Sequence, residues 1–171
     1  MNMKSETTVQ QISQFRDVFG DKLQIGVMMS RYTSARVGGP ADMFLVVESA
    51  LELQTAVSLA YTLGVPYFIL GGGSNVLVSD AGVRGLIIMN KAKAVKYRHS
   101  GAHVVCIAES GMNFSSLARQ CIAKGLGGLE WAVGVPGTVG GAVVGNSGAH
   151  GADMNSNLRA ATIWEPGRGP R

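Results

Sequence analysis

The sequence predicts a mixed α/β (α+β) fold, a small parallel β-α-β unit followed by a mainly antiparallel sheet with helices. The first observation is an apolar strand pattern at residues 43–47 and 65–70 with a helical pattern between them, an order that favours parallel strands joined by a right-handed crossover. The second is three short strand patterns at residues 85–89, 94–97 and 104–108, the last two separated by a Ser-Gly turn. The third is composition, because 171 residues with 46% hydrophobic and 15% charged side chains can form a sizeable core in about one domain.

Local signals set the limits of the expected helices. Apolar residues at helical spacing predict a first helix over residues 6–19, ended by a glycine and packed only lightly. Ser49 is a favourable N-cap for the second helix, and Glu52 occupies the capping-box position three residues later. A third helix is expected to begin after Asn113 and to end at Gly125.

Two glycine-rich segments carry the strongest functional signal. The first arm, residues 71–75, follows an apolar strand pattern, and the second arm, residues 134–142, lies in a segment, residues 125–151, that holds ten of the 24 glycines. A diphosphate needs several main-chain N–H donors close by, and glycine allows that approach without side chains in the way. The pairing predicts two arms that close on one phosphate-bearing ligand.

Other known motifs and structures explain the two arms less well. The first arm lacks the third glycine and the later acidic residue of a dinucleotide fingerprint, and no Lys-Ser or Lys-Thr pair follows it as in a P-loop. An ordinary tight turn uses the same residues, so this alternative stays open for the first arm taken alone. Residues 131–149 carry no charge, but repeated Gly with Pro, Asn and Ser disfavours a membrane span, and the valines disfavour a flexible linker. A packed loop is expected there.

Four sequence blocks, in a fixed order, resemble one family of flavoenzymes. They lie at residues 32–41, 70–78, 127–130 and 134–149. Together they are similar to the N-terminal, FAD-binding part of the UDP-N-acetylenolpyruvoylglucosamine reductases, also called UDP-N-acetylmuramate dehydrogenases, which make UDP-N-acetylmuramate for peptidoglycan.

The resemblance implies a fold of the FAD-binding PCMH type and non-covalent FAD as cofactor. It implies an N-terminal helical segment at residues 1–30, a first FAD-binding subdomain at residues 31–90 and a truncated second one at residues 91–171. The arms would hold the FAD diphosphate and flank the flavin through Gly71, Gly72, Gly73, Ser74, Asn75, Gly134, Pro136, Gly137, Thr138, Gly140, Gly141, Ala142, Asn146, Gly148 and Ala149. Arg36 either faces the diphosphate or is a solvated loop charge, and the role of His150, where the family often has tyrosine, stays open.

The family's catalytic motifs do not occur in this sequence. These are a Tyr-Arg-x-Ser segment, a Gly-Ser-x-Phe-Lys-Asn-Pro segment and a glutamate near the carboxyl terminus, so we expect no catalytic residue, no substrate domain and no turnover by this chain alone. Residues 158–164 alternate as a strand and residues 164–171 look like a hairpin turn, which suggests a truncated reading frame. In the full-length family NADPH is the reductant and a UDP-sugar the substrate. The alternatives are another FAD-dependent oxidase or dehydrogenase of the same superfamily, and a non-catalytic remnant.

The remaining side chains point to no other chemistry. The formal charge is +4. The residues nearest to a basic cluster lie at 91–98, and their spacing suggests the solvent-exposed face of a strand. Neither nucleic acid nor a membrane is therefore expected as a partner. His99 and His103 flank a turn, and no metal site is expected. Cys106 and Cys121 stand in apolar contexts typical of buried thiols, and no secretion signal is evident, which favours the cytoplasm. Lone carboxylates such as Glu109 and Glu130 are expected to serve as cap or turn partners.

Overall fold

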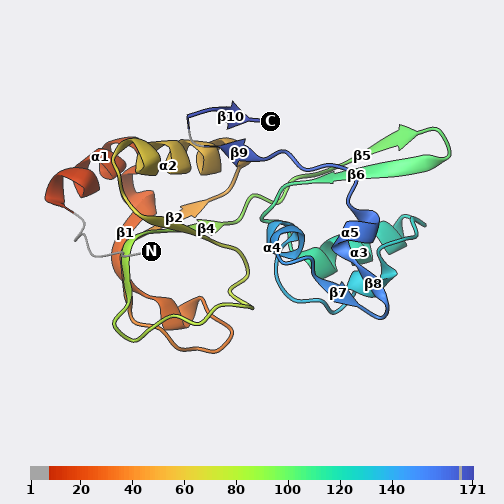
Figure 1. Ribbon diagram of the computed structural model, residues 1–171, viewed down its shortest axis with the longest axis horizontal. Coiled ribbons are helices and arrows are strands. Elements are labelled where there is room, and N and C mark those ends of the chain that lie inside the picture. Colours follow the sequence, from red (N-terminus) through yellow and green to blue (C-terminus); the bar gives the residue numbers. More distant parts are fainter. Residues whose placement is uncertain (1–7, 166) are drawn as a thin grey trace.

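The computed structural model describes residues 8–165 and 167–171, which form two lobes side by side (Figure 1). The first lobe, residues 8–90, holds the four-stranded sheet and the two longest helices. The second lobe, residues 91–163, holds a long hairpin, short helices and the glycine-rich segment. A small C-terminal hairpin returns from the second lobe to the helices of the first (Figure 1).

The sheet of the first lobe has the order β1-β2-β4-β3. Its strands are β1 (Leu23–Met28), β2 (Pro40–Val47), β3 (Tyr67–Leu70) and β4 (Val83–Asn90). Strands β2 and β3 both pair in parallel with β4, so the predicted parallel β-α-β unit is confirmed, with β4 inserted between its two strands. The sequence analysis did not predict β1, which pairs antiparallel with β2 and has only Leu23 buried. A half-exposed edge strand has little apolar alternation to reveal it.

The helices α1 (Val9–Phe19) and α2 (Ala50–Thr62) cover one face of this sheet (Figure 1). Thr8 is the N-cap of α1, and the predicted start at Glu6 lies outside the described residues. Gly20, with φ of +55°, ends the helix as expected. The expectation of light packing is wrong, because Phe15 is fully buried in the core between α1 and the sheet.

Apolar side chains of β2 and β4 are buried on both faces of the sheet. One core lies toward α1 and α2 and includes Met43, Leu45, Val47, Leu86 and Ile88. The other lies on the opposite face and includes Met29, Phe44, Leu70, Ile87 and Met89. A strand buried on both faces reads as a continuous apolar run, which is why β4 is evident in the sequence.

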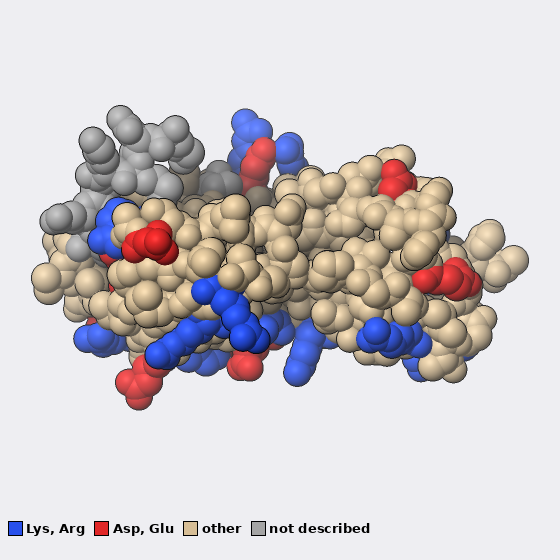
Figure 2. Space-filling model, turned by 90° about the horizontal axis from the view of Figure 1, so that it is seen from below, with Lys and Arg blue, Asp and Glu red and all other residues tan. Residues whose placement is uncertain are grey.

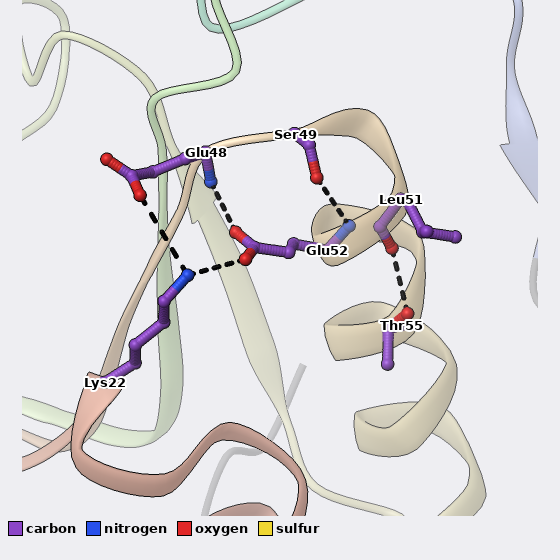
Figure 3. Close-up of polar contacts among 6 residues, drawn as sticks. All are labelled: Lys22, Glu48, Ser49, Leu51, Glu52 and Thr55. Carbon is purple, nitrogen blue, oxygen red and sulfur yellow. Dashed lines mark hydrogen bonds and ion pairs between the residues drawn. The ribbon is translucent and has the colours of Figure 1, made fainter.

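The N-terminus of α2 departs from its predicted capping box (Figure 3). The Ser49 hydroxyl accepts a hydrogen bond from the Glu52 N–H at 3.2 Å, as expected for an N-cap. The Glu52 carboxylate, however, accepts from the Glu48 N–H at 2.7 Å instead of the Ser49 N–H, and its other oxygen lies 2.6 Å from Lys22 Nζ. The hydrogen bond from Lys22 is the main cause that lowers the pKa of Glu52, and the same bond raises the pKa of Lys22. The carboxylate therefore ties α2 to the turn before β1.

The second lobe opens with the antiparallel hairpin of β5 (Val95–Ser100) and β6 (His103–Ala108), close to the predicted strands. Helix α3 (Phe114–Ala123) follows its predicted cap, Asn113, whose side chain accepts from the Ser116 N–H at 2.8 Å. The glycine-rich segment was expected to be a packed loop, and it also contains a short helix, α4 (Val139–Val144). The remaining elements of this lobe are β7 (Gly148–Ala149), β8 (Ala152–Asp153) and α5 (Met154–Asn157). Three 3-10 turns, Gly20–Lys22, Met29–Arg31 and Glu130–Ala132, complete the described helical structure.

The predicted strand over residues 158–164 is wrong except for its last residue. Residues 158–163 are exposed and irregular, and β9 (Trp164–Glu165) pairs with β10 (Gly169–Pro170) in a hairpin. Residues 158–162 pair with no neighbouring strand among the described residues, whereas Ile163 exchanges two main-chain hydrogen bonds with Arg171 and so extends the hairpin. The predicted C-terminal hairpin is present. Within residues 8–165 and 167–171, no helix has the length and apolar character to cross a membrane.

Candidate functional site: two glycine arms in contact

The first arm leaves β3 at the carboxyl end of the parallel strands, where ligands collect in open α/β sheets. Gly73 has φ of +67°, and a β-carbon at this position would overlap the carbonyl oxygen of Tyr32. The Ser34 N–H donates to the Gly73 carbonyl at 2.9 Å. Residues 32–34 therefore support the arm from one side, and glycine is required by both its torsion and this close approach.

The second arm is fastened to the start of α3 by main-chain hydrogen bonds. The Phe114 N–H donates to the Gly137 carbonyl at 3.1 Å, and the Val139 N–H donates to the Met112 carbonyl at 2.8 Å. The Thr138 side chain caps α4 by accepting from the Gly141 N–H at 3.3 Å. The arm is thus held in one shape by its own lobe.

The two arms touch each other. A β-carbon on Gly71 would lie 2.5 Å from Thr138 Oγ1, and one on Gly72 would lie 3.1 Å from Gly137 Cα. A β-carbon on Gly137 would come to 4.0 Å from Ser74 Oγ. Segments more than sixty positions apart in the sequence therefore meet backbone to backbone, and side chains at these glycines would separate them.

Several main-chain donors are available where the arms meet. No hydrogen bond within the described part of the chain uses the N–H groups of Gly72, Gly73, Ser74, Asn75, Gly137 or Thr138. Gly72, Ser74 and Asn75 are exposed. Converging free amides on glycine turns are suited to an anion such as a phosphate, so the chemistry of this donor set fits a diphosphate.

Some of the predicted site residues are occupied by the fold itself. The Gly134 N–H donates to Ser115 Oγ at 3.0 Å, the Gly140 N–H donates to the Ser110 carbonyl at 2.8 Å, and Ala142 is buried in the core of the second lobe. Pro136 is exposed, and Gly141 lies in the first turn of α4. These positions shape the arm. Pro136 has no N–H, and the N–H groups of Gly134, Gly140, Gly141 and Ala142 already have partners within the chain.

Asn146, Gly148 and Ala149 lie beyond the carboxyl end of α4, away from the point of contact between the arms. The Asn146 amide donates to Asp153 Oδ2 at 3.0 Å, which is the main cause that lowers the pKa of Asp153, and it accepts from the Asn155 N–H at 2.9 Å. A β-carbon on Gly148 would lie 2.9 Å from the Ala152 carbonyl oxygen. The Asn146 side chain and the Gly148 backbone therefore both contact residues of the β7–β8 region.

The residues of open role lie on exposed loops. Arg36 and His150 are both exposed and have positive φ, +55° and +53°. His99 and His103 are exposed at the hairpin turn, as expected. Glu109 accepts from the N–H groups of Ala50 and Ala94 at 3.0 and 2.8 Å, so it is the turn and cap partner predicted for it.

The cysteines are free and differ in burial. Cys121 is buried, whereas Cys106 is only partly buried, less than predicted. Burial is the main cause that raises the pKa of the Cys106 thiol to about 11, with the nearby Cys121 as a further cause. A thiol with this pKa is a poor nucleophile at neutral pH.

On the face shown in Figure 2, several Lys and Arg side chains lie near one another along the lower edge with Asp and Glu among them, and most of the remaining surface is uncharged. Lys91, Lys93, Lys96 and Arg98 are exposed, whereas Ala92 between them is buried. Lys96 and Arg98 lie on the exposed face of β5, as predicted, whereas Lys91 and Lys93 precede the strand.

The site also depends on residues that the sequence analysis did not select. Asn90 is buried and donates to Ser110 Oγ at 2.9 Å, and Ser110 in turn contacts the second arm. Neither stands in a motif. An asparagine at the end of an apolar strand pattern is a weak signal that could have identified Asn90.

Comparison with known proteins now bears on this geometry. A family model described as a FAD binding domain matches residues 41–169, which include both arms. The chain belongs to this FAD-binding family. Family membership supports FAD as the cofactor of this domain.

Similar proteins in the family are reductases of one kind. The UDP-N-acetylenolpyruvoylglucosamine reductase of Rubrobacter xylanophilus is 46% identical over 140 residues, 82% of this chain and 46% of that protein. The protein of the same name from Clostridium novyi is 40% identical over 84% of this chain and 46% of its own length. The chain spans about half the length of the curated relatives it matches. In sequence it corresponds to the FAD-binding portion of these reductases, which confirms the resemblance.

Solved structures support the same fold. The UDP-N-acetylenolpyruvylglucosamine reductase of Thermus caldophilus superimposes with a TM-score of 0.60 at 31% identity, over 77% of this chain and 46% of that one. An alkyldihydroxyacetonephosphate synthase superimposes with a TM-score of 0.61 at 16% identity, over 91% of this chain and 35% of that one, a likeness of fold alone. The predicted FAD-binding α/β fold is confirmed.

Proposed function

We propose that this chain binds FAD non-covalently between its two glycine arms and forms the cofactor-binding part of a UDP-N-acetylenolpyruvoylglucosamine reductase. The observation that carries the proposal is the contact of Gly71 and Gly72 with Thr138 and Gly137, with free main-chain donors on both sides. Gly72, Gly73, Ser74, Asn75, Gly137 and Thr138 would donate to the diphosphate. Gly71, Gly134, Pro136, Gly140, Gly141, Ala142, Asn146, Gly148 and Ala149 would shape the wall beside it.

In the complete protein we propose an oxidoreductase that uses NADPH to reduce the enolpyruvyl group of UDP-N-acetylglucosamine enolpyruvate, a cytoplasmic step toward peptidoglycan. Bound FAD would supply the electron-transfer chemistry. The residues of this chain would bind and orient the cofactor, whereas a proton donor and a cation for the substrate carboxylate would have to come from outside the motifs present here. We therefore expect this chain alone to bind FAD and to show no reductase turnover.

The first prediction tests the second arm by comparing substitutions at two glycines that have nearly equal φ angles. Gly137 has φ of +103° and Gly128 has φ of +108°, and a β-carbon at either would meet no atom closer than 3.6 Å. Ala at either position should cost about 1 kcal/mol of stability or more through backbone strain. Gly137→Ala should also weaken FAD binding at least tenfold, because the arm would change shape where it meets Gly72.

The measurement is fluorescence titration of the apoprotein with FAD, together with urea unfolding of each variant. Gly128→Ala is the control, with a similar loss of stability and FAD affinity within about twofold of the wild type. Equal effects of the two variants on FAD affinity would contradict the role of the second arm. Failure of well-folded wild-type protein to take up FAD would reject the function itself.

A further inference from the structure

The two arms belong to different lobes, and one partly buried hydrogen bond links those lobes beside the second arm. Asn90, the last residue of the central strand β4, is 4% exposed. Its Nδ2 donates to Ser110 Oγ at 2.9 Å, and its Oδ1 accepts from the Ala92 N–H at 3.1 Å. Both ends of the amide are therefore engaged within the protein.

Ser110 passes this constraint to the second arm through its main chain. Its carbonyl accepts from the Gly140 N–H at 2.8 Å, two residues after Thr138. A β-carbon on Gly140 would lie 2.9 Å from Ser110 Cβ, so the two residues are already in tight contact. Ser110 thus contacts the sheet of the first lobe with its hydroxyl and the second arm with its backbone.

The neighbouring contacts between the lobes are more accessible to water. The Glu109 carboxylate bridges the N–H groups of Ala50 and Ala94, and both bonds are exposed. Water can replace an exposed acceptor at little cost, whereas a buried amide that loses its acceptor keeps an unpaired donor. The bond between Asn90 and Ser110 is therefore less accessible to water than the bonds of Glu109.

We propose that Asn90 and Ser110 are a positioning pair that holds the second arm at its distance from the first before FAD binds. The proposal rests on the proposed function, since FAD binding across the arms is what this placement serves. An arm that is already ordered loses less entropy when the ligand binds, so the pair raises affinity without touching the cofactor.

The test uses Ser110→Ala in the full 171-residue chain, because it removes the hydroxyl and retains the β-carbon packed against Gly140. We expect FAD to bind about tenfold more weakly, the effect of one partly buried hydrogen bond. In the apoprotein, we expect the amide hydrogen of Gly140 to exchange about tenfold faster, while amides of α1 keep their wild-type rates.

Thr8→Ala is the matched control, because it removes a hydroxyl acceptor from the N-cap of α1, remote from both arms. It should lower stability but leave FAD affinity within about twofold and Gly140 exchange unchanged. Asn90→Ala and the double variant complete a cycle, in which Ser110→Ala should add less than about twofold to FAD dissociation once Asn90 has been removed.

A Ser110→Ala variant that matches Thr8→Ala in both FAD affinity and Gly140 exchange would overturn the proposal, as would full additivity in the cycle. Wild-type protein that binds no FAD would reject the proposed function instead. Gly140 exchange in Ser110→Ala would still decide the positioning pair in that case, because it is measured without cofactor.

Discussion

The two lobes are stabilised by different groups. In the first lobe, apolar side chains from both faces of the sheet are fully buried, among them Phe44, Leu45 and Ile88. In the second lobe, Phe114 alone ranks with the largest fully buried side chains of the described chain. Side chains cap the helices of both lobes, with Thr8 and Ser49 in the first. Asn113, Thr138 and Asp153 each cap a helix.

The difference between the lobes matches what each contributes to the site. Apolar burial is non-directional, so a sheet built on it tolerates adjustment and can serve as a platform. Hydrogen bonds to the main chain fix a specific geometry, which a loop of glycines needs because glycine leaves its torsions free. In the second lobe, Asn113 and Thr138 bond to the main chain of the second arm and so help to fix its backbone shape.

The largest expected effect separates the two lobes by their cores. Phe44→Ala should cost about 3–5 kcal/mol, because Phe44 is fully buried and its ring packs 4.4 Å from that of Tyr32. Trp164 packs on the core of the first lobe and Trp131 lies in the core of the second, so single-tryptophan variants report each lobe. We expect urea unfolding followed by Trp164 to shift to lower denaturant more than unfolding followed by Trp131. Equal shifts would show that the lobes unfold as one unit and would break the comparison.

A smaller effect compares equivalent caps in the two lobes. Ser49→Ala in α2 and Asn113→Ala in α3 should each cost about 1 kcal/mol, measured by thermal or urea unfolding. Asn113 Nδ2 also donates to the Gly137 carbonyl at 3.3 Å, so Asn113→Ala should weaken FAD binding several-fold, whereas Ser49→Ala should not. If both caps change stability and neither changes FAD affinity, the second lobe does not differ from the first in this respect.

The smallest expected effect is a pH-dependent one in the first lobe. The hydrogen bond from Lys22 lowers the pKa of Glu52 below its ordinary value of 4.5, so this carboxylate contributes stability above that pH and loses it as pH falls through the lowered pKa. Glu52→Gln should therefore reduce stability by less than about 1 kcal/mol at pH 7, because the pair is partly exposed. Urea midpoints of variant and wild type should converge at pH values below the lowered pKa of Glu52. A difference that persists there would assign the effect to packing instead of charge.

Predictions from the sequence are correct where the local signal is strong. The caps Ser49 and Asn113, the stop at Gly20, the buried strand β4 and the hairpin of β5 and β6 were all predicted, since each depends on neighbours within a few positions. The exposed edge strand β1 was missed, and the strand over residues 158–164 was wrong, because in both cases pairing with a distant strand decides the outcome. The Glu52 carboxylate does not bond to the Ser49 N–H, its expected partner, for a similar reason. It pairs with Lys22, which comes from a distant part of the chain.

By itself the sequence determined that two segments are rich in glycine and belong to one family pattern, because composition and order are local properties. Only the tertiary structure decided that Gly71 and Gly72 meet Thr138 and Gly137, and that Asn90 and Ser110 join the lobes beside them. These contacts join residues that are far apart along the chain but adjacent in space, and their existence depends on how both lobes pack. The sequence specifies the parts of the site, and packing sets the distances between them.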